Sequence, residues 1–135
     1  IPDEIAKKYT DENRFGYIYE LLQCDLERLK KWFQFCYNEK MNDNNYGTYW
    51  FMDHVIPIHT FDIKNNFEEC KKNCYSWYNI SPLESISNSQ KFIGIDKKQL
   101  ERHLNNLKNY CAQNNLEVDK EYLLLCATHL GAGTS

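Results

Sequence analysis

Glycine and proline are scarce in this sequence, with five Gly and three Pro among 135 residues. Chains that remain disordered are commonly rich in these two residues, so their scarcity argues for a folded chain. Long apolar runs are also absent, and a membrane-spanning helix needs about 20 consecutive apolar residues. No basic and apolar leader precedes Pro2. We therefore expect an intracellular domain, in the cytoplasm or nucleus of a host cell, without membrane contact.

An excess of positive charge is missing too. The chain has 16 Lys and Arg against 19 Asp and Glu, a net charge of −3. Because phosphate binding favours a basic surface, this total does not by itself indicate a nucleic-acid partner. The charge is unevenly distributed, however, and residues 85–116 are mainly basic. Their charged residues are Lys91, Lys97, Lys98, Arg102 and Lys108, with Asp96 and Glu101. Both a local basic face and an ordinary solvated helix surface are consistent with this pattern.

The six cysteines lack the spacing of a disulfide framework, and no secretory signal precedes them. Cys70 and Cys74 could supply half of a zinc site, but no second close pair completes it. The other four lie among apolar residues of helical segments. We interpret them as small buried hydrophobic residues.

Aromatic residues are plentiful, with ten Tyr, seven Phe and three Trp. A chain of 135 residues with this many aromatic side chains can form the core of one domain. Apolar residues recur at three- and four-residue steps, which predicts helices on both sides of a central region. Asp25 and Asp96 are the expected N-caps of the first two helices. Asp119 is the expected cap of the last. The expected flanking helical regions are 17–38, with one or two turns before Asp25 and a helix of about 26–38 after it, 96–113 and 119–130. Strands are expected at 49–56 and 75–80 between them. We expect 131–135 to be a tail or linker, and the tryptophans to be core residues.

The central region contains an acid and a histidine side by side, Asp53-His54, before a strand-ending Pro57. On a regular strand these neighbours point to opposite faces, so a shared site requires the strand to end or bulge there. Asn79 and Asn88 follow nine positions apart. Carboxylate and amide oxygens are ligands suited to Mg²⁺ or Mn²⁺. A neutral histidine near the ion could accept a proton from an attacking water molecule.

These residues carry a family resemblance over positions 17–92. The chain resembles the HNH endonucleases, and within them a subgroup from phages and large viruses. The matching motifs are Asp53-His54-Val55-Ile56-Pro57, Asn79-Ile80-Ser81-Pro82-Leu83 and Asn88-x2-Lys91. Further matches are Leu22-x-Cys24-x2-Glu27-x-Leu29, Met41-x3-Asn45-Tyr46-Gly47, Trp50 and Phe61-Asp62. The resemblance implies an α+β fold with a small ββα-metal core, at about 49–92, in a single nuclease domain spanning 1–130.

The resemblance also implies roles for individual residues. His54 would be the general base, and Asn79 would fasten the loop that orients it. Asp53 and Asn88 would hold one metal ion. With Asn at the third motif position, that ion should be Mg²⁺ or Mn²⁺ and not zinc. Lys91 would lie near phosphate, and Lys97, Lys98 and Arg102 would extend this nucleic-acid contact.

The function implied by the resemblance is metal-dependent hydrolysis of DNA that leaves a 5′-phosphate and a 3′-hydroxyl. A catalytically lapsed nucleic-acid-binding module and a protein-interaction module on the same fold remain alternatives. No recognition helix or finger for reading bases stands out in the sequence. An additional DNA-recognition domain or partner outside this chain would then supply specificity.

Overall fold

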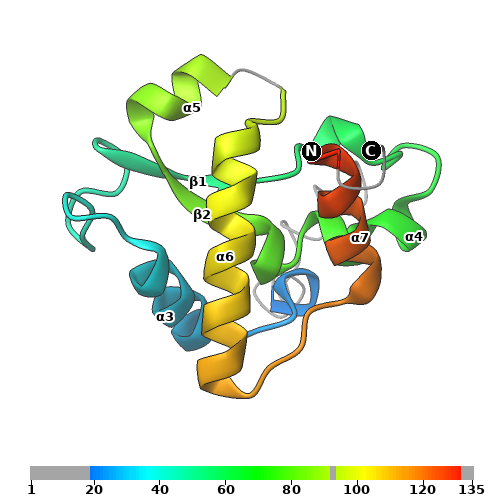
Figure 1. Cartoon of the computed structure of the whole chain (residues 1–135), viewed down its shortest axis with the longest axis horizontal. Coiled ribbons are helices and arrows are strands. Elements are labelled where there is room, and N and C mark those ends of the chain that lie inside the picture. The colour runs from blue at the N-terminus through cyan, green and yellow to red at the C-terminus, as the bar shows by residue number, and fades with distance from the viewer. Residues whose placement is uncertain (1–18, 92–93, 132–135) are drawn as a thin grey trace, which may run out of the picture.

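The computed structural model of the chain describes residues 19–91 and 94–131. Its centre is a two-stranded antiparallel sheet with helices packed around it (Figure 1). The strands are β1 (Trp50–His54) and β2 (Ile80–Glu84). The α-helices are α3 (Leu26–Cys36), α4 (Phe67–Cys74), α5 (Ser85–Lys91), α6 (Lys97–Asn114) and α7 (Lys120–His129). Two short 3-10 helices are η1 (Ile58–Thr60) and η2 (Trp77–Asn79). This arrangement confirms the α+β prediction.

Three helices begin at the aspartates predicted from the sequence. The Asp25 side chain accepts a hydrogen bond from the backbone N–H of Arg28 at 2.8 Å. Asp96 accepts from two N–H groups in the first turn of α6, and Asp119 accepts from one in α7. Each carboxylate satisfies a donor that has no partner within its helix and complements the positive end of the helix dipole. The flanking helices are therefore defined locally by the sequence.

The second strand differs from its predicted position. The sequence predicted a strand at 75–80 that ends before Ser81-Pro82, whereas β2 begins at Ile80 and contains both residues. Pro82 pairs with Met52 in the sheet. Each strand of a two-stranded sheet has an open edge, so a residue without an N–H group is tolerated there. The aromatic residues assigned to the strand, Trp77 and Tyr78, instead form η2 and lie buried in the core.

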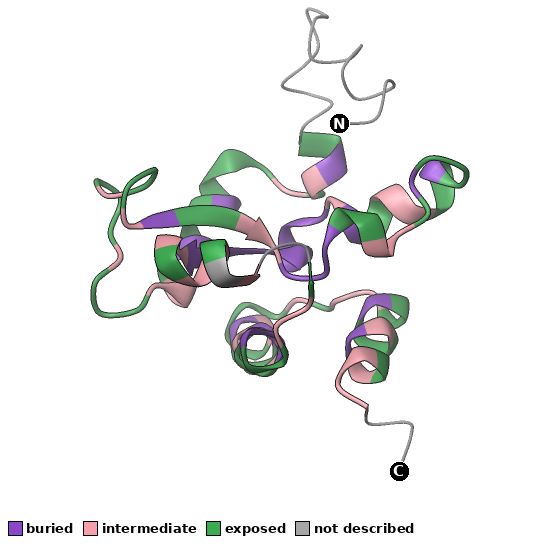
Figure 2. Cartoon of the chain, turned by 90° about the horizontal axis from the view of Figure 1, so that it is seen from above, coloured by how far each residue is buried: buried purple, intermediate pink, exposed green. Residues whose placement is uncertain are grey.

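Trp32 of α3 lies at the centre of the hydrophobic core and is fully buried. Its ring contacts Trp77 and Tyr110 edge to face, with centroids 5.4 and 5.1 Å apart. Its Nε1–H donates to the carbonyl oxygen of Ile80 at 2.7 Å, which ties α3 to β2. Helix α6 crosses the sheet, and the buried residues converge where helices and sheet meet (Figures 1 and 2). The three tryptophans are all buried, as predicted.

Several smaller expectations can be compared with the structure. All six cysteines are free. Within the described residues, no helix is both long enough and apolar enough to cross a membrane. Residues 17–18 of the first predicted helix and 132–135 of the predicted tail lie outside the described residues.

Replacing Trp32 with phenylalanine should lower the free energy of unfolding by about 2–4 kcal/mol. The smaller ring leaves a cavity, and the buried Ile80 carbonyl loses its donor. Tyr46→Phe, at an exposed aromatic residue, is the control and should change stability by less than about 0.5 kcal/mol. Urea unfolding measures both values. Equal stability of the two variants would contradict the central position of Trp32.

Candidate functional site

Three of the predicted site residues lie where β1 ends and α5 ends. Asp53 and His54 are the last two residues of β1, and Lys91 is the last residue of α5. Strand β2 leads directly into α5, and this helix packs against both strands. The local order is therefore strand, loop with α4, strand and helix. Close packing of α5 on the sheet brings residues almost 40 positions apart into contact.

Lys91 is an internal counter-ion of Asp53. Its Nζ lies 2.6 Å from Asp53 Oδ2, and the lysine side chain is only 3% exposed. The same ammonium donates to the carbonyl oxygens of His54 and Val55 at 2.9 and 3.2 Å. The sequence predicted Lys91 near phosphate at a binding surface. In the structure its ammonium is enclosed by three protein oxygens, because the β1 carboxylate and the turning backbone attract it inward.

Asp53 has a second partner that the sequence did not indicate. Gln99 of α6 donates from Nε2 to Asp53 Oδ2 at 2.8 Å. Among the described residues, the hydrogen bonds to the Asp53 side chain all reach Oδ2. Oδ1 is therefore the oxygen that remains for a metal ion. The side chain is 12% exposed, so a small ion has limited access.

His54 is half-buried, and its ring meets Tyr75 edge to face at 5.9 Å. Burial lowers the pKa of His54 below its ordinary value of 6.5; Asp53 opposes this shift, and Lys91 adds to it. Its Nε2 atom is buried and has no hydrogen-bond partner in the described part of the chain. Burial thus favours the neutral imidazole, the form that a general base needs.

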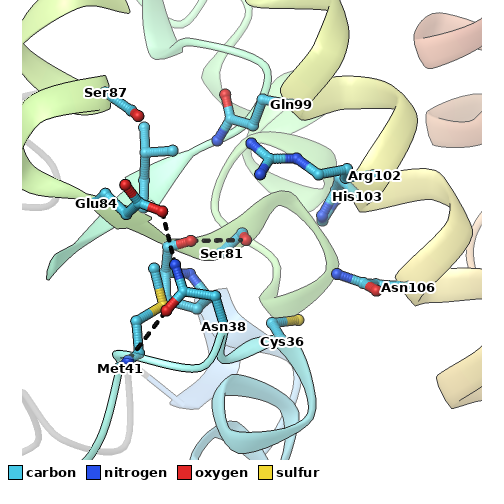
Figure 3. A pocket seen from close by; sticks show the side chains of 12 residues that line it. Cys36, Asn38, Met41, Ser81, Glu84, Ser87, Gln99, Arg102, His103 and Asn106 are labelled. Carbon is cyan, nitrogen blue, oxygen red and sulfur yellow. Dashed lines mark hydrogen bonds between the residues drawn. The ribbon is translucent and has the colours of Figure 1, made fainter.

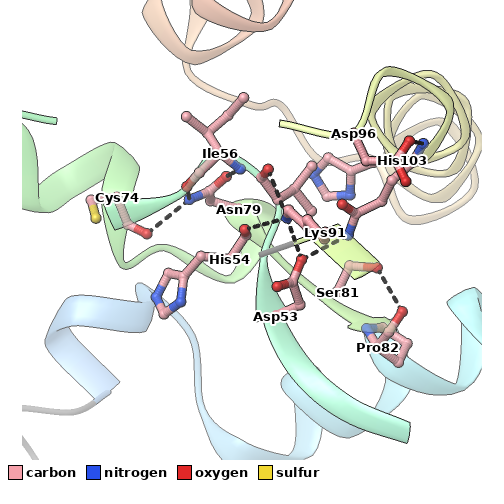
Figure 4. Close-up of polar contacts among 12 residues, drawn as sticks. Asp53, His54, Ile56, Cys74, Asn79, Ser81, Pro82, Lys91, Asp96 and His103 are labelled. Atoms are coloured by element: carbon pink, nitrogen blue, oxygen red, sulfur yellow. Dashed lines mark hydrogen bonds and ion pairs between the residues drawn. The ribbon is translucent and has the colours of Figure 1, made fainter. Parts of the chain in front are cut away.

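The His54 ring and the Asp53 carboxylate are turned away from each other (Figure 4). Strand β1 ends at His54, two residues before the end of the predicted strand at 49–56, yet the two neighbouring side chains keep the alternation of a regular strand. The strand end alone therefore does not bring both groups to one face. A shared reaction site requires the imidazole to rotate about its side-chain bonds.

Asn79 fastens the segment that follows His54. It is fully buried at the end of η2. Its Oδ1 accepts from the N–H of Ile56 at 2.9 Å, and its Nδ2 donates to the carbonyl oxygens of Ile56 and Cys74, each at 3.0 Å. Its backbone carbonyl accepts from the N–H of Val55 at 2.9 Å. These are the loop contacts expected of the middle asparagine. Its part in catalysis stays a prediction.

The remaining predicted residues lie on two helices. Asn88 is half-buried on α5. Lys97 and Lys98 are exposed in the first turn of α6, and Arg102 is exposed one turn further along the same helix. The roles of these four residues in binding a metal ion or DNA stay predictions.

A small polar pocket of about 70 Å³ lies between α3, β2, α5 and α6. Arg102, Gln99 and His103 extend into it from α6 (Figure 3). The pocket has room for roughly two water molecules, which is too little for a nucleobase. Gln99 lines this pocket and also contacts Asp53, so the space lies next to the candidate site.

Sequence reasoning missed Gln99, His103 and Tyr122. None of the three is among the candidate site residues predicted from the sequence. All three are buried polar residues of α6 and α7 that connect to Asp53 or Asn79. The four-residue step from Gln99 to His103 places two polar side chains on the buried face of a helix, and this pattern was the available signal.

Two proteins of Acanthamoeba polyphaga mimivirus are similar to this chain. They are the uncharacterized proteins L426 and L246, which are 37% and 34% identical to it over 84 residues. The matched segments cover 62% of this chain and 36% of each relative, so the chain spans about a third of their length. No family model and no solved structure matches the chain. The relatives are viral, and their names state no activity.

Replacing Lys91 with methionine should lower the free energy of unfolding by about 2–4 kcal/mol. The change leaves a poorly exposed carboxylate and two backbone carbonyls without their shared donor. Lys72→Met is the matched control, because Lys72 is 58% exposed and pairs with Asp119 at 3.5 Å. The control should cost less than about 1 kcal/mol. Urea unfolding measures both values. If the two methionine variants were equally stable, Lys91 would not be an internal counter-ion of Asp53.

Proposed function

We propose that this domain is a metal-dependent DNA endonuclease of the HNH type with a ββα-metal core. The observation that carries the proposal is the attachment of Asn79 to the backbone just after Asp53-His54. The antiparallel strands and the helix that directly follows them also agree with such a core. The first motif and Asn79, joined by contacts across 23 positions of the sequence, thus belong to one local unit.

The donor set is compatible with one hard divalent ion. Described residues provide no cluster of three His, Cys, Asp or Glu side chains for a metal. Magnesium does not need such a cluster, because it keeps several water ligands and uses one or two protein oxygens together with substrate phosphate. Asp53 Oδ1 and the Asn88 amide oxygen would be these two ligands. The bound ion would stabilise the charge that develops on the scissile phosphate and on the leaving oxygen.

The protein's own part in the reaction is the handling of the proton. Neutral His54 would accept a proton from the attacking water molecule at its unpaired ring nitrogen, Nε2. For this the imidazole must turn from Tyr75 toward the substrate. Asn79 keeps the backbone after His54 fixed while the ring moves. Lys97, Lys98 and Arg102 would contact the DNA backbone on the exposed side of α6.

A second candidate is a DNA-binding module that has lost cleavage. The Lys91 ammonium already neutralises Asp53, and the His54 ring points away from that carboxylate; both observations favour this candidate. Such a module would bind DNA in the presence of Ca²⁺ and leave it intact in Mg²⁺. Under the endonuclease proposal, DNA is retained in Ca²⁺ and cut in Mg²⁺.

His54→Ala should reduce the rate of plasmid nicking by about 10²–10⁴-fold, the usual effect of losing a general base. His59→Ala, in the exposed η1 segment, is the matched control and should cut at the wild-type rate. In the wild type, kcat/KM should fall at acid pH with a midpoint below 6.5, because burial lowers the pKa of His54 and protonation removes the base. An undiminished rate in His54→Ala would exclude His54 as the general base.

Two asparagine variants should separate metal binding from loop attachment. Asn88→Ala should weaken Mn²⁺ binding in a calorimetric titration and leave the melting temperature nearly unchanged. Asn79→Ala should keep Mn²⁺ affinity close to wild type but lose about 2–4 kcal/mol of stability, since it leaves several buried backbone groups unpaired. Loss of the metal in Asn79→Ala and its retention in Asn88→Ala would mean that these assignments are reversed.

A further inference from the structure

The Asn79 amide is held by a chain of buried hydrogen bonds that comes from the two C-terminal helices. Tyr122 of α7 donates its hydroxyl proton to Asn79 Oδ1 at 2.7 Å. His103 of α6 lies with Nε2 3.1 Å from that hydroxyl and 2.6 Å from the carbonyl oxygen of Tyr78. All three side chains are almost completely buried. This chain of contacts lies mostly outside the segment that carries the motifs.

The direction of every proton in this chain can be assigned. The Tyr78 carbonyl can only accept, so His103 must carry its proton on Nε2. The Tyr122 hydroxyl oxygen then shares this Nε2–H as a second, longer acceptor at 3.1 Å, while its own proton goes to Asn79. Burial lowers the pKa of His103 to about 4 and raises that of Tyr122, so both side chains stay neutral at pH 7. The network therefore has one hydrogen-bond arrangement near neutral pH.

The orientation of the Asn79 amide depends on this arrangement. Its Oδ1 accepts from Tyr122 and Ile56, and its Nδ2 donates to Ile56 and Cys74. All four hydrogen-bonding positions of the amide are thus used. Without the Tyr122 hydroxyl, one of the two contacts that hold Oδ1 is lost. The Ile56 segment, two residues after His54, is then attached by a less constrained side chain.

We propose that Tyr122 is a positioning residue that acts on His54 through Asn79, with His103 orienting the Tyr122 hydroxyl. The catalytic part of this inference rests on the proposed endonuclease function. Helices α6 and α7 then belong to the site and are more than a support for the core. An error of about 1 Å in a positioned group can reduce a rate on the order of 10²-fold, so a single lost contact should have a measurable effect.

Tyr122→Phe tests the proposal, and Tyr78→Phe is its matched control. Each change removes one buried hydroxyl and keeps the ring; the Tyr78 hydroxyl donates to Asn73 at 2.6 Å and does not contact Asn79. In Tyr122→Phe, Ile56 still pairs with Asn79, and the carbonyl oxygen of Tyr78 still pairs with His103. The fold should therefore persist. Thermal melts should show that each variant is folded and loses a few degrees of melting temperature.

The deciding readout is the ring of His54, followed by proton NMR at one fixed pH and assigned by its absence in His54→Ala. Tyr122→Phe should shift the His54 ring signal, whereas Tyr78→Phe should leave it unchanged. Tyr122→Phe should also lower kcat about tenfold with little change in KM. The proposal is overturned if the His54 ring signal is identical in both variants. A wild-type protein that does not cut DNA refutes the proposed function alone, because the NMR comparison needs no cleavage.

Discussion

The attachment of Asn79 to the backbone at Val55 and Ile56 is the interaction on which the rest of the site depends. Strand β1 ends at His54, and beyond it the chain would turn away without a partner in the sheet. The Asn79 side chain and main chain together satisfy the next polar groups in a region without access to water. Since an unpaired buried group costs about 1–3 kcal/mol, few other residue types can occupy this position. This attachment gives the end of β1 a defined conformation.

The charges around this attachment are unusual for a metal-binding site. Lys91 and Gln99 both hold Asp53 Oδ2, so the carboxylate is fixed in position and already neutralised. Breaking a buried ion pair is costly, which makes the arrangement stable when no metal ion is bound. Binding of Mg²⁺ through Oδ1 would add a second cation near the Lys91 ammonium. This repulsion predicts a modest metal affinity that substrate phosphate strengthens, because the phosphate supplies the missing negative charge.

The sequence was most informative where structure is determined locally. The three helix caps follow from single aspartates, and the α+β class follows from strand and helix patterns. The position of β2 could not be predicted in the same way, because Pro82 is normally a strand breaker and only its place in a two-stranded sheet makes it acceptable. The motif pointed to Asn79 as the residue that attaches the loop, and its part in catalysis stays a prediction. The inward turn of Lys91 could not be predicted, because a lysine that follows a polar helical segment usually points to solvent.

The long-range polar contacts could not be predicted from the sequence, for a physical reason. Tyr122 reaches Asn79 across 43 positions, and Gln99 reaches Asp53 across 46. Such pairs depend on how α6 and α7 pack against the sheet, which no local pattern specifies. Likewise, the alternation of Asp53 and His54 could be anticipated, but the direction of each side chain depends on Tyr75 and Lys91 beside them.

Hydrolysis of DNA with the aid of a divalent ion is the activity proposed for this site. The most direct measurement is an end-group analysis of labelled duplex DNA after incubation with the protein and Mg²⁺, with EDTA as the control. We expect nicked products with a 5′-phosphate and a 3′-hydroxyl that DNA ligase can rejoin, and none in EDTA. DNA that is bound in Ca²⁺ but stays uncut at every Mg²⁺ and Mn²⁺ concentration would contradict the endonuclease proposal, as would products ending in a 3′-phosphate.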